Sequence, residues 1–239
     1  RGFLVLEQSN LELSNLDSSN LEVYMTEEMV ALLRRCDWAE VVRLASEQKK
    51  ALRVLFKLLY HQDDHLHWLA AEAIGKYAYD IGEKDIEKPR EIMRRLLWSL
   101  NEENGGSPWG SVEAIGAITV ERPETFFAYV SIQFAFSEDE TLLPGIIWTQ
   151  AQMGRLLPGR LDEYRDFIIG CTKHSVDSVR GYAAWAIGEL GWVEGEEALQ
   201  RLAGDNAVVG LYERGGGYRK LTVAEIARES QDVLLKRKK

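Results

Sequence analysis

The residues best suited to chemistry are tryptophans and glutamates that recur at fixed distances from a series of glycines. Trp68 and Trp109 each lie seven residues before such a glycine, and Glu72 and Glu113 each lie three residues before the same two glycines. A carboxyl group can hold or protonate a ligand, and an indole ring can stack on one. The spacing predicts a ligand or partner groove around these four residues. The structural alternative is that the tryptophans pack in a core and the glutamates face solvent.

Three more residues complete the predicted site. Trp148 lies six residues before a later glycine of the series, one place out of register. Asn101 and Trp109 bound a polar turn that we expect at the rim of the groove, and Arg180 lies in the most complete copy of the repeated pattern. The candidate binding residues are therefore Trp68, Glu72, Asn101, Trp109, Glu113, Trp148 and Arg180.

The sequence supports a metal site or a catalytic nucleophile less well than it supports the predicted groove. His61, His65 and His67 cluster beside two aspartates, but His61 and His65 are expected to straddle a bend between helices, so their spacing of four has no geometric meaning. Neither cysteine stands in a catalytic motif, and GxSxG is absent. We predict no metal, no cofactor and no catalytic residue, which favours a protein that is not an enzyme.

The turn from Asn101 to Trp109 could bend the chain or cradle a phosphate. Gly105 and Gly106 are expected to end a helix that begins near Lys88, and Ser107 followed by Pro108 suits the start of the next helix. A phosphate loop would need GxxxxGK[ST], which is missing. The pattern therefore favours a bend between two helices.

Composition and charge limit the partners. The net charge is −9 over 239 residues; residues 1–24 carry −3 and the tail at 236–239 carries +4, which leaves −10 for the body. Such a body repels phosphate backbones, so we predict no nucleic-acid binding and a solvated basic tail. No apolar run reaches the roughly 18 residues of a membrane span, and two distant cysteines suit a reducing compartment. These features predict a cytoplasmic protein without membrane contact.

Residues 1–24 differ from the rest of the chain. They contain three five-residue units, from Ser9, Ser14 and Ser19, which resemble the units of pentapeptide-repeat proteins but are too few to bury a core. We expect a poorly ordered leader there, ahead of a natural start at Met25, and one repeat domain over 25–235. A first helix is expected near 27–35, capped by Thr26, and a second near 38–47, capped by Asp37.

Internal repetition gives the strongest signal of fold. A short motif of small residues ending in glycine recurs with its glycines 41, 38 and 34 residues apart, and Ala227 follows 39 residues after the last of them. Helical repeats of this length indicate an α-solenoid, and small residues let neighbouring helices approach closely. The copies are Ala71–Gly75, Val112–Gly116, Ala151–Gly154 and Ala184–Gly188, with a weaker fifth at Glu225–Ala227.

The motif resembles HEAT-like repeats, specifically those related to phycobilisome lyase subunits, with the pattern V-R-x-x-A-A-x-A-[LI]-G. Residues 178–188 fit it almost fully, 66–75 fit with His67 in the arginine place, 107–116 fit in their second half, and 145–154 are degenerate. The stretch from Leu96 to Ile118, with Glu121 to Glu124 after it, also resembles a bacterial HEAT-repeat family common in sulfate reducers. This resemblance covers about 36–229 and carries no activity. It implies an all-α, right-handed α-solenoid of about five helix pairs.

An insertion near the C-terminus departs from the helical pattern. Residues 206–222 place apolar residues on both sides of three glycines, which predicts a short β-hairpin. Thr222 and Glu225 form a capping box for a last helix that ends near Leu235. We expect the hairpin to cap the apolar end of the stack, with a partner-binding hairpin as the alternative.

Two functions remain open at this level. The first is a non-catalytic protein-binding scaffold or assembly factor that captures a protein partner with the second helix, helix B, of each repeat. The second, implied by the lyase-type resemblance, is an enzyme or chaperone for a chromophore or other cofactor. In that case Glu72 and Glu113 would hold or protonate the ligand and the tryptophans would stack on it.

Overall fold

The computed structural model describes residues 18–100 and 110–237, without the side chains of 18, 19 and 21. The described chain is mostly helical, with one small antiparallel sheet near the C-terminus. Its α-helices are α2 (Ser18–Arg34), α3 (Trp38–Glu47), α4 (Lys49–Leu58), α5 (Asp64–Gly82), α6 (Glu87–Leu100), α7 (Ser111–Glu121), α8 (Pro123–Phe126), α9 (Ala128–Phe134), α10 (Leu143–Leu156), α11 (Arg165–Cys171), α12 (Asp177–Leu190), α13 (Glu196–Arg201) and α14 (Val223–Arg237). The strands are β1 (Val208–Glu213) and β2 (Gly217–Thr222), and short 3-10 turns lie at Asp162–Tyr164, Val193–Gly195 and Leu202–Gly204.

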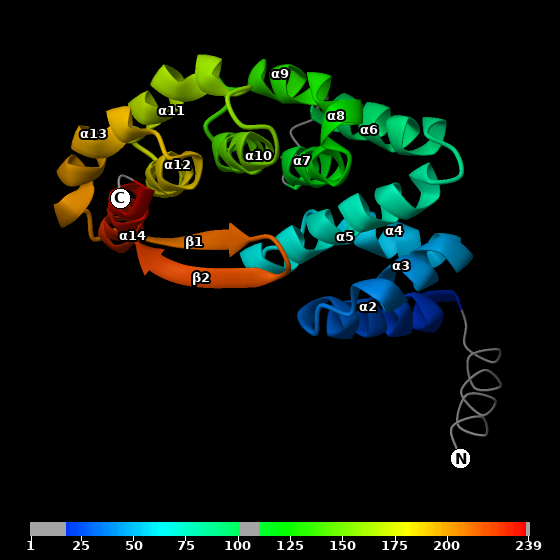
Figure 1. Ribbon diagram of the computed structural model, residues 1–239. Helices are drawn as coiled ribbons and strands as arrows, with labels where there is room; N and C mark the ends of the chain where they lie inside the picture. The colour runs from blue at the N-terminus through cyan, green and yellow to red at the C-terminus, as the bar shows by residue number, and fades with distance from the viewer. Residues whose placement is uncertain (1–17, 101–109, 238–239) are drawn as a thin grey trace.

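Five helices form an inner row in which each packs on the next: α5, α7, α10, α12 and α14. We call these the inner helices. Other helices cover their outer side, with α6 on α7, α9 on α7 and α10, α11 on α12, and α13 on α14. Figure 1 shows the two layers bending together into an arc, with α2, α3 and α4 beside α5 at one end. No helix of the described chain is long and apolar enough to cross a bilayer.

The repeat glycines lie at the contacts between inner helices. A Cβ added to Gly75 of α5 would come within 2.8 Å of the backbone of Ala117 on α7. One added to Gly188 of α12 would come within 2.8 Å of the backbone of Ser230 on α14. Any side chain at these positions would push the two helices apart. The sequence prediction that these glycines allow close helix contact is confirmed.

The two ends of the domain differ from the predicted boundaries. The first helix of the described chain, α2, begins at Ser18 and not after Thr26, so residues 18–24 belong to it and the rest of the expected leader lies outside the described residues. Thr26 is not a cap, because its hydroxyl donates to the carbonyl of Glu22 within the helix. Lys236 and Arg237, expected in a solvated tail, form the last turn of α14.

Two predicted caps are confirmed. Asp37 accepts a hydrogen bond from the backbone N–H of Glu40 at the start of α3. At the start of α14 the Glu225 carboxylate accepts from the backbone N–H of Thr222, and the Thr222 hydroxyl oxygen accepts from the backbone N–H of Glu225. This reciprocal pair is the expected capping box, and it satisfies two backbone N–H groups at the start of α14.

The predicted hairpin exists, but it does not cap the end of the stack. β1 and β2 pair antiparallel, with Val208 opposite Thr222 and Glu213 opposite Gly217. β1 contacts both α12 and α5, and Figure 1 shows the hairpin running from α14 across the open side of the arc to α5. The hairpin therefore covers the inner side of the arc, which sequence analysis expected to be an open groove.

Candidate functional site

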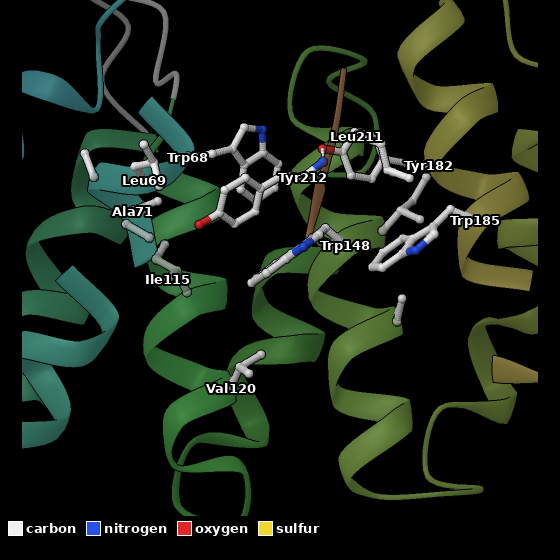
Figure 2. Packing of buried hydrophobic residues seen from close by; sticks show 14 of the residues in the cluster. Trp68, Leu69, Ala71, Ile115, Val120, Trp148, Tyr182, Trp185, Leu211 and Tyr212 are labelled. Atoms are coloured by element: carbon white, nitrogen blue, oxygen red, sulfur yellow. Dashed lines mark hydrogen bonds between the residues drawn. The ribbon is translucent and has the colours of Figure 1, made fainter. Parts of the chain in front are cut away.

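An aromatic cluster fills the middle of the inner side. Trp68 of α5 stacks on Tyr212 of β1 with ring centroids 4.9 Å apart and on Tyr182 of α12 at 5.9 Å. Trp148 of α10 approaches Trp68 to 5.2 Å, and Figure 2 shows both beside the Tyr212 ring. Trp68 is 4% exposed and Trp148 is 1% exposed. The prediction that these tryptophans line an open groove is therefore wrong, because the hairpin supplies the ring that covers them.

Glu72 is the residue that fastens the hairpin to the inner helices. Its carboxylate accepts a hydrogen bond from the Tyr212 hydroxyl at 2.5 Å and from the backbone N–H of Gly215 at 2.9 Å. Lys76, one turn later on α5, lies 3.2 Å from the same carboxylate. Burial and the nearby Glu72 charge raise the pKa of Tyr212, so its proton stays in place to make this bond. Glu72 is thus occupied by the protein itself and not by a partner.

The tip of the hairpin has further contacts with the N-terminal half. Arg214 pairs with Glu121 at the end of α7 at 2.8 Å, and the carbonyl of Gly216 lies 3.0 Å from His65 Nε2. Gly216 has a φ of +94°, and a Cβ there would lie 2.2 Å from the sulfur of Cys36. Only glycine fits this conformation and this space. The tip of the hairpin therefore packs closely against α5 and the segment before α3.

Glu113 faces a different space, on the other edge of the hairpin. Its Oε1 lies 3.9 Å from Nε2 of His67 on α5. Glu113 Oε2 and His67 Nε2 are both buried and have no hydrogen-bond partner among the described residues. Buried polar atoms in folded proteins nearly always have partners, so two unpartnered atoms on neighbouring side chains mark a place where a ligand can bind. The spacing predicted that Glu113 and Glu72 share one groove, but in the structure they line two different cavities.

Burial shifts both groups toward their neutral forms. It raises the pKa of Glu113 to about 7, against the opposing effect of the backbone N–H groups of Glu113 and Gly110. It lowers the pKa of His67 to about 4, against the raising effect of Asp64 and Asp63. Between these pH values both side chains are uncharged, so the 3.9 Å contact is not an ion pair there. A carboxyl with this pKa can exchange a proton with a ligand near neutral pH.

These two groups lie in a cavity of about 280 Å³, which we call the inner pocket. Its mouth includes Asp64, whose carboxylate accepts a 3.4 Å hydrogen bond from the hydroxyl of Tyr218 on β2. Burial, followed by the Asp64 charge, raises the pKa of Tyr218 to about 12. The lining residues are Asp64, His67, Trp68, Gly110, Glu113, Thr141, Leu142, Pro144, Ser178, Tyr182, Gly210 and Tyr218.

A larger cavity, of about 590 Å³, lies on the opposite edge of the hairpin and is lined partly by Glu72, Lys76 and Arg155. Its charges are already matched within the protein. Lys76 pairs with Glu72, Arg155 pairs with Glu189 at 2.9 Å, and the Arg214–Glu121 pair closes one side. This cavity therefore offers less to a charged ligand than the inner pocket does.

The remaining predicted site residues have other outcomes. Arg180 donates to Asp205 and Asp177, both at 2.7 Å, and to the carbonyls of His174 and Ser175. It fixes the loops around α12 and is not available to a partner. Asn101 and Trp109, with the Ser107 cap, lie outside the described residues; α7 begins at Ser111, after Gly110. In the described part of the chain, no three His, Cys, Asp or Glu residues are placed to hold a metal.

A scan of protein-family models and a search of curated proteins both return no match for this chain. The residues of the inner pocket are therefore the main guide to function. Glu113 was predicted through its register, whereas His67 was named in the histidine cluster and in the arginine place of one repeat but not as a binding residue. Tyr182, Tyr212 and Tyr218 were not predicted as site residues. The only signal for these tyrosines was their position in the last full repeat and on both arms of the predicted hairpin.

Proposed function

We propose that the protein is a non-catalytic binding protein, a scaffold or assembly factor built as a right-handed α-solenoid of about five HEAT-like helix pairs. It would take its client at the inner pocket, in the cytoplasm, where its two free cysteines would stay reduced. The inner row of helices, with a repeat glycine at each contact, supports the HEAT-like part of this proposal.

One observation carries the binding function: Glu113 Oε2 and His67 Nε2 are buried without a hydrogen-bond partner among the described residues, and both residues line one pocket. Leaving a polar group unpaired in the interior costs about 1–3 kcal/mol, and a ligand that pairs both would recover it. Such groups serve recognition, since they reward a ligand with matching atoms and penalise one without them.

The way of binding differs from the one expected from the sequence. A protein partner lying along the whole helix-B face would have to displace the hairpin, which Glu72, Tyr212 and Gly215 hold in place. A client that reaches only the inner pocket leaves these contacts intact. We therefore propose recognition of a small group, on a protein partner or on a free molecule, in place of capture along an open groove.

A chromophore or cofactor chaperone is the second candidate, favoured by the carboxyl of Glu113, which can hold or protonate a ligand near neutral pH. Of the residues expected to handle a chromophore, Glu72 bonds the hairpin, and Trp68 and Trp148 pack on Tyr212. Glu113 is left to act with His67, in a pocket of about 280 Å³. This function would require a ligand small enough for that space.

Photochemical crosslinking tests the proposed function. A benzophenone amino acid replaces Thr141, which is exposed at the edge of the inner pocket, and in a control protein it replaces Ser46, which is exposed on α3. We expect a client to be captured from position 141, not from position 46, and to be lost when Glu113→Gln is added. Equal products from both positions, or capture unaffected by Glu113→Gln, would contradict a client at this pocket.

A further inference from the structure

The inner pocket has an unbalanced charge. Asp64 at its mouth and Glu113 at its base are carboxyl groups, and among the described residues no lysine or arginine lines the cavity. Glu113 is 7% exposed, and its Oε2 has no hydrogen-bond partner in the part of the chain that the structure describes. The second cavity differs, because each of its carboxylates lies beside a lysine or arginine. The chemistry of the inner pocket is therefore that of a site for a positive group with hydrogen atoms to donate.

We infer that the inner pocket binds a primary ammonium group, seated between Glu113 and His67. An ammonium group has three N–H donors and no acceptor. It can donate to Glu113 Oε2 and to His67 Nε2, in the tautomer that carries its proton on Nδ1, and so satisfy both unpartnered atoms. This inference rests on the proposed function and names the chemical class of the ligand.

The rest of the cavity suits the carbon chain of such a ligand. Leu142 and Pro144, at the start of α10, provide apolar lining, and so do the rings of Trp68 and Tyr182. Aromatic rings also attract cations through their negative faces. A short alkyl chain ending in an ammonium therefore matches the pocket at both ends, with Asp64 near the entrance.

Three other classes of small ligand would pair less well with the residues of the inner pocket. A carboxylate or phosphate would meet two carboxyl groups with no cation to offset them. A quaternary ammonium has the charge but no N–H to donate, so both unpartnered atoms would stay unpaired. An alcohol of the same length could donate one hydrogen bond, but it has one donor where the ammonium has three, and no charge with which to form an ion pair with a carboxylate.

Without a ligand, burial favours the protonated form of Glu113. A bound ammonium favours the carboxylate form, so binding should release a proton from Glu113. The titratable groups that face Glu113 are His67 and Asp64 from α5, Tyr182 from α12 and Tyr218 from β2; α10 contributes only uncharged residues to the lining. His67 is neutral above its pKa of about 4, and both tyrosines keep their protons at neutral pH. Affinity should therefore fall as pH drops below about 7 because Glu113 takes up its proton.

The same chemistry can come from a free amine or from a lysine side chain of a partner protein. The two sources differ beyond the alkyl chain, since a lysine in a protein continues into an amide backbone at the mouth of the pocket. Butylammonium mimics the shared part, and N-acetyl-lysine methylamide adds the backbone. Tighter binding of the second probe would indicate a protein partner, and tighter binding of the first would indicate a free amine.

Isothermal titration calorimetry of the full chain tests the inference. The probes are butylammonium, tetramethylammonium, butanol and butyrate, at about pH 8 and about pH 6. We expect butylammonium to bind best, to weaken about tenfold or more in Glu113→Gln, and to weaken at the lower pH. Glu197→Gln, at a carboxylate that is 83% exposed, is the matched control and should bind as the wild type does.

The outcomes separate the two proposals. Preferential binding of butanol or butyrate, with loss in Glu113→Gln, would overturn the ammonium inference and leave the pocket as a binding site. Butylammonium binding that is equal in Glu113→Gln and Glu197→Gln would overturn it as well. No crosslinked client at position 141, together with no binding of any of the four probes, would overturn the proposed function itself.

Discussion

The carboxylate of Glu72 accepts a 2.5 Å hydrogen bond from the hydroxyl of Tyr212, although the two residues are 140 positions apart in the chain. The contact joins α5, in the first part of the inner row, to the hairpin that precedes the last helix. Together with the N–H of Gly215 it turns an arc of helices into a closed arrangement. Closure of this kind restricts the ends of a helical stack, which otherwise contact only their neighbours.

Removing the Tyr212 hydroxyl should destabilise the whole domain. In Tyr212→Phe the ring remains and the hydrogen bond to a buried carboxylate is lost, so we expect a loss of about 1.5–3 kcal/mol in the free energy of unfolding. Urea unfolding followed by far-UV circular dichroism measures it. Tyr60→Phe is the control, since Tyr60 is 51% exposed and its change should stay within about 0.5 kcal/mol.

A double-mutant cycle with Glu72→Gln separates the energy of the Glu72–Tyr212 hydrogen bond from the other effects of changing each residue. The coupling between Tyr212→Phe and Glu72→Gln should be on the order of 1 kcal/mol or more, because both changes remove the same charge-assisted bond. Additive effects of the two changes would show that the hairpin is held by its apolar contacts alone.

A methyl group at Gly75 should also be costly. Its Cβ would lie 2.8 Å from the Ala117 backbone, so Gly75→Ala should lose about 1–3 kcal/mol of stability through overpacking. Gly170, in α11, has no atom within 4 Å of such a Cβ, and Gly170→Ala should gain about 0.5–1 kcal/mol from helix propensity. Thermal unfolding of the two variants checks this, and a gain in both would mean that the inner helices do not touch at Gly75.

The tryptophans give a direct contrast between core and surface. Trp148 is 1% exposed, so Trp148→Ala should cost about 3–5 kcal/mol or prevent folding. Trp98 is 70% exposed, and Trp98→Ala should change stability by about 0.5 kcal/mol or less. Chemical denaturation of both variants measures the difference. Similar small losses would restore Trp148 as an open binding residue.

Glu113 should make stability depend on pH in a defined direction. Its pKa rises from 4.5 in the unfolded chain to about 7 in the folded one, so the folded state binds more protons between these values. Its contribution is fully present below about pH 4.5 and is lost as pH rises through about 7. His67, with a lowered pKa, contributes in the opposite direction between about pH 4 and 6.5, so wild type alone shows little change there.

Comparison with Glu113→Gln isolates the contribution of the Glu113 carboxyl to the pH dependence of stability. The variant cannot ionise, so it should match the wild type near pH 4.5 and be more stable by about 3 kcal/mol near pH 8. Urea unfolding of both proteins across this range measures the difference. Parallel curves would mean that Glu113 ionises as easily in the folded state as in the unfolded one.

The sequence predicted the close contacts between helices well because the packing constraint falls on single residues. Gly75 and Gly188 must be glycine where helix backbones meet, so their spacing records the stacking directly. The capping box of Thr222 and Glu225 was equally readable, because both of its hydrogen bonds are local. In such cases the residue types and the contact they serve lie in one short segment.

The site was harder to predict because it depends on contacts distant in the chain. The hairpin was visible as a local pattern, but its seat on Glu72 depends on a pairing across 140 residues. Placing it at the end of the stack left Trp68 and Trp148 on an open face, where the structure has them under Tyr212. Glu113 was chosen for its register, and nothing in the register distinguished its carboxyl, whose Oε2 has no partner among the described residues, from the bonded carboxyl of Glu72.

The most direct test of this account is an NMR titration of the Glu113 carboxyl carbon, in protein labelled with ¹³C-glutamate and assigned through Glu113→Gln. The account predicts a midpoint near 7, as burial gives it, and a lower midpoint when butylammonium is added. A midpoint near the ordinary glutamate value of about 4.3, unchanged by butylammonium, would contradict a buried, unpaired carboxyl that binds a cation.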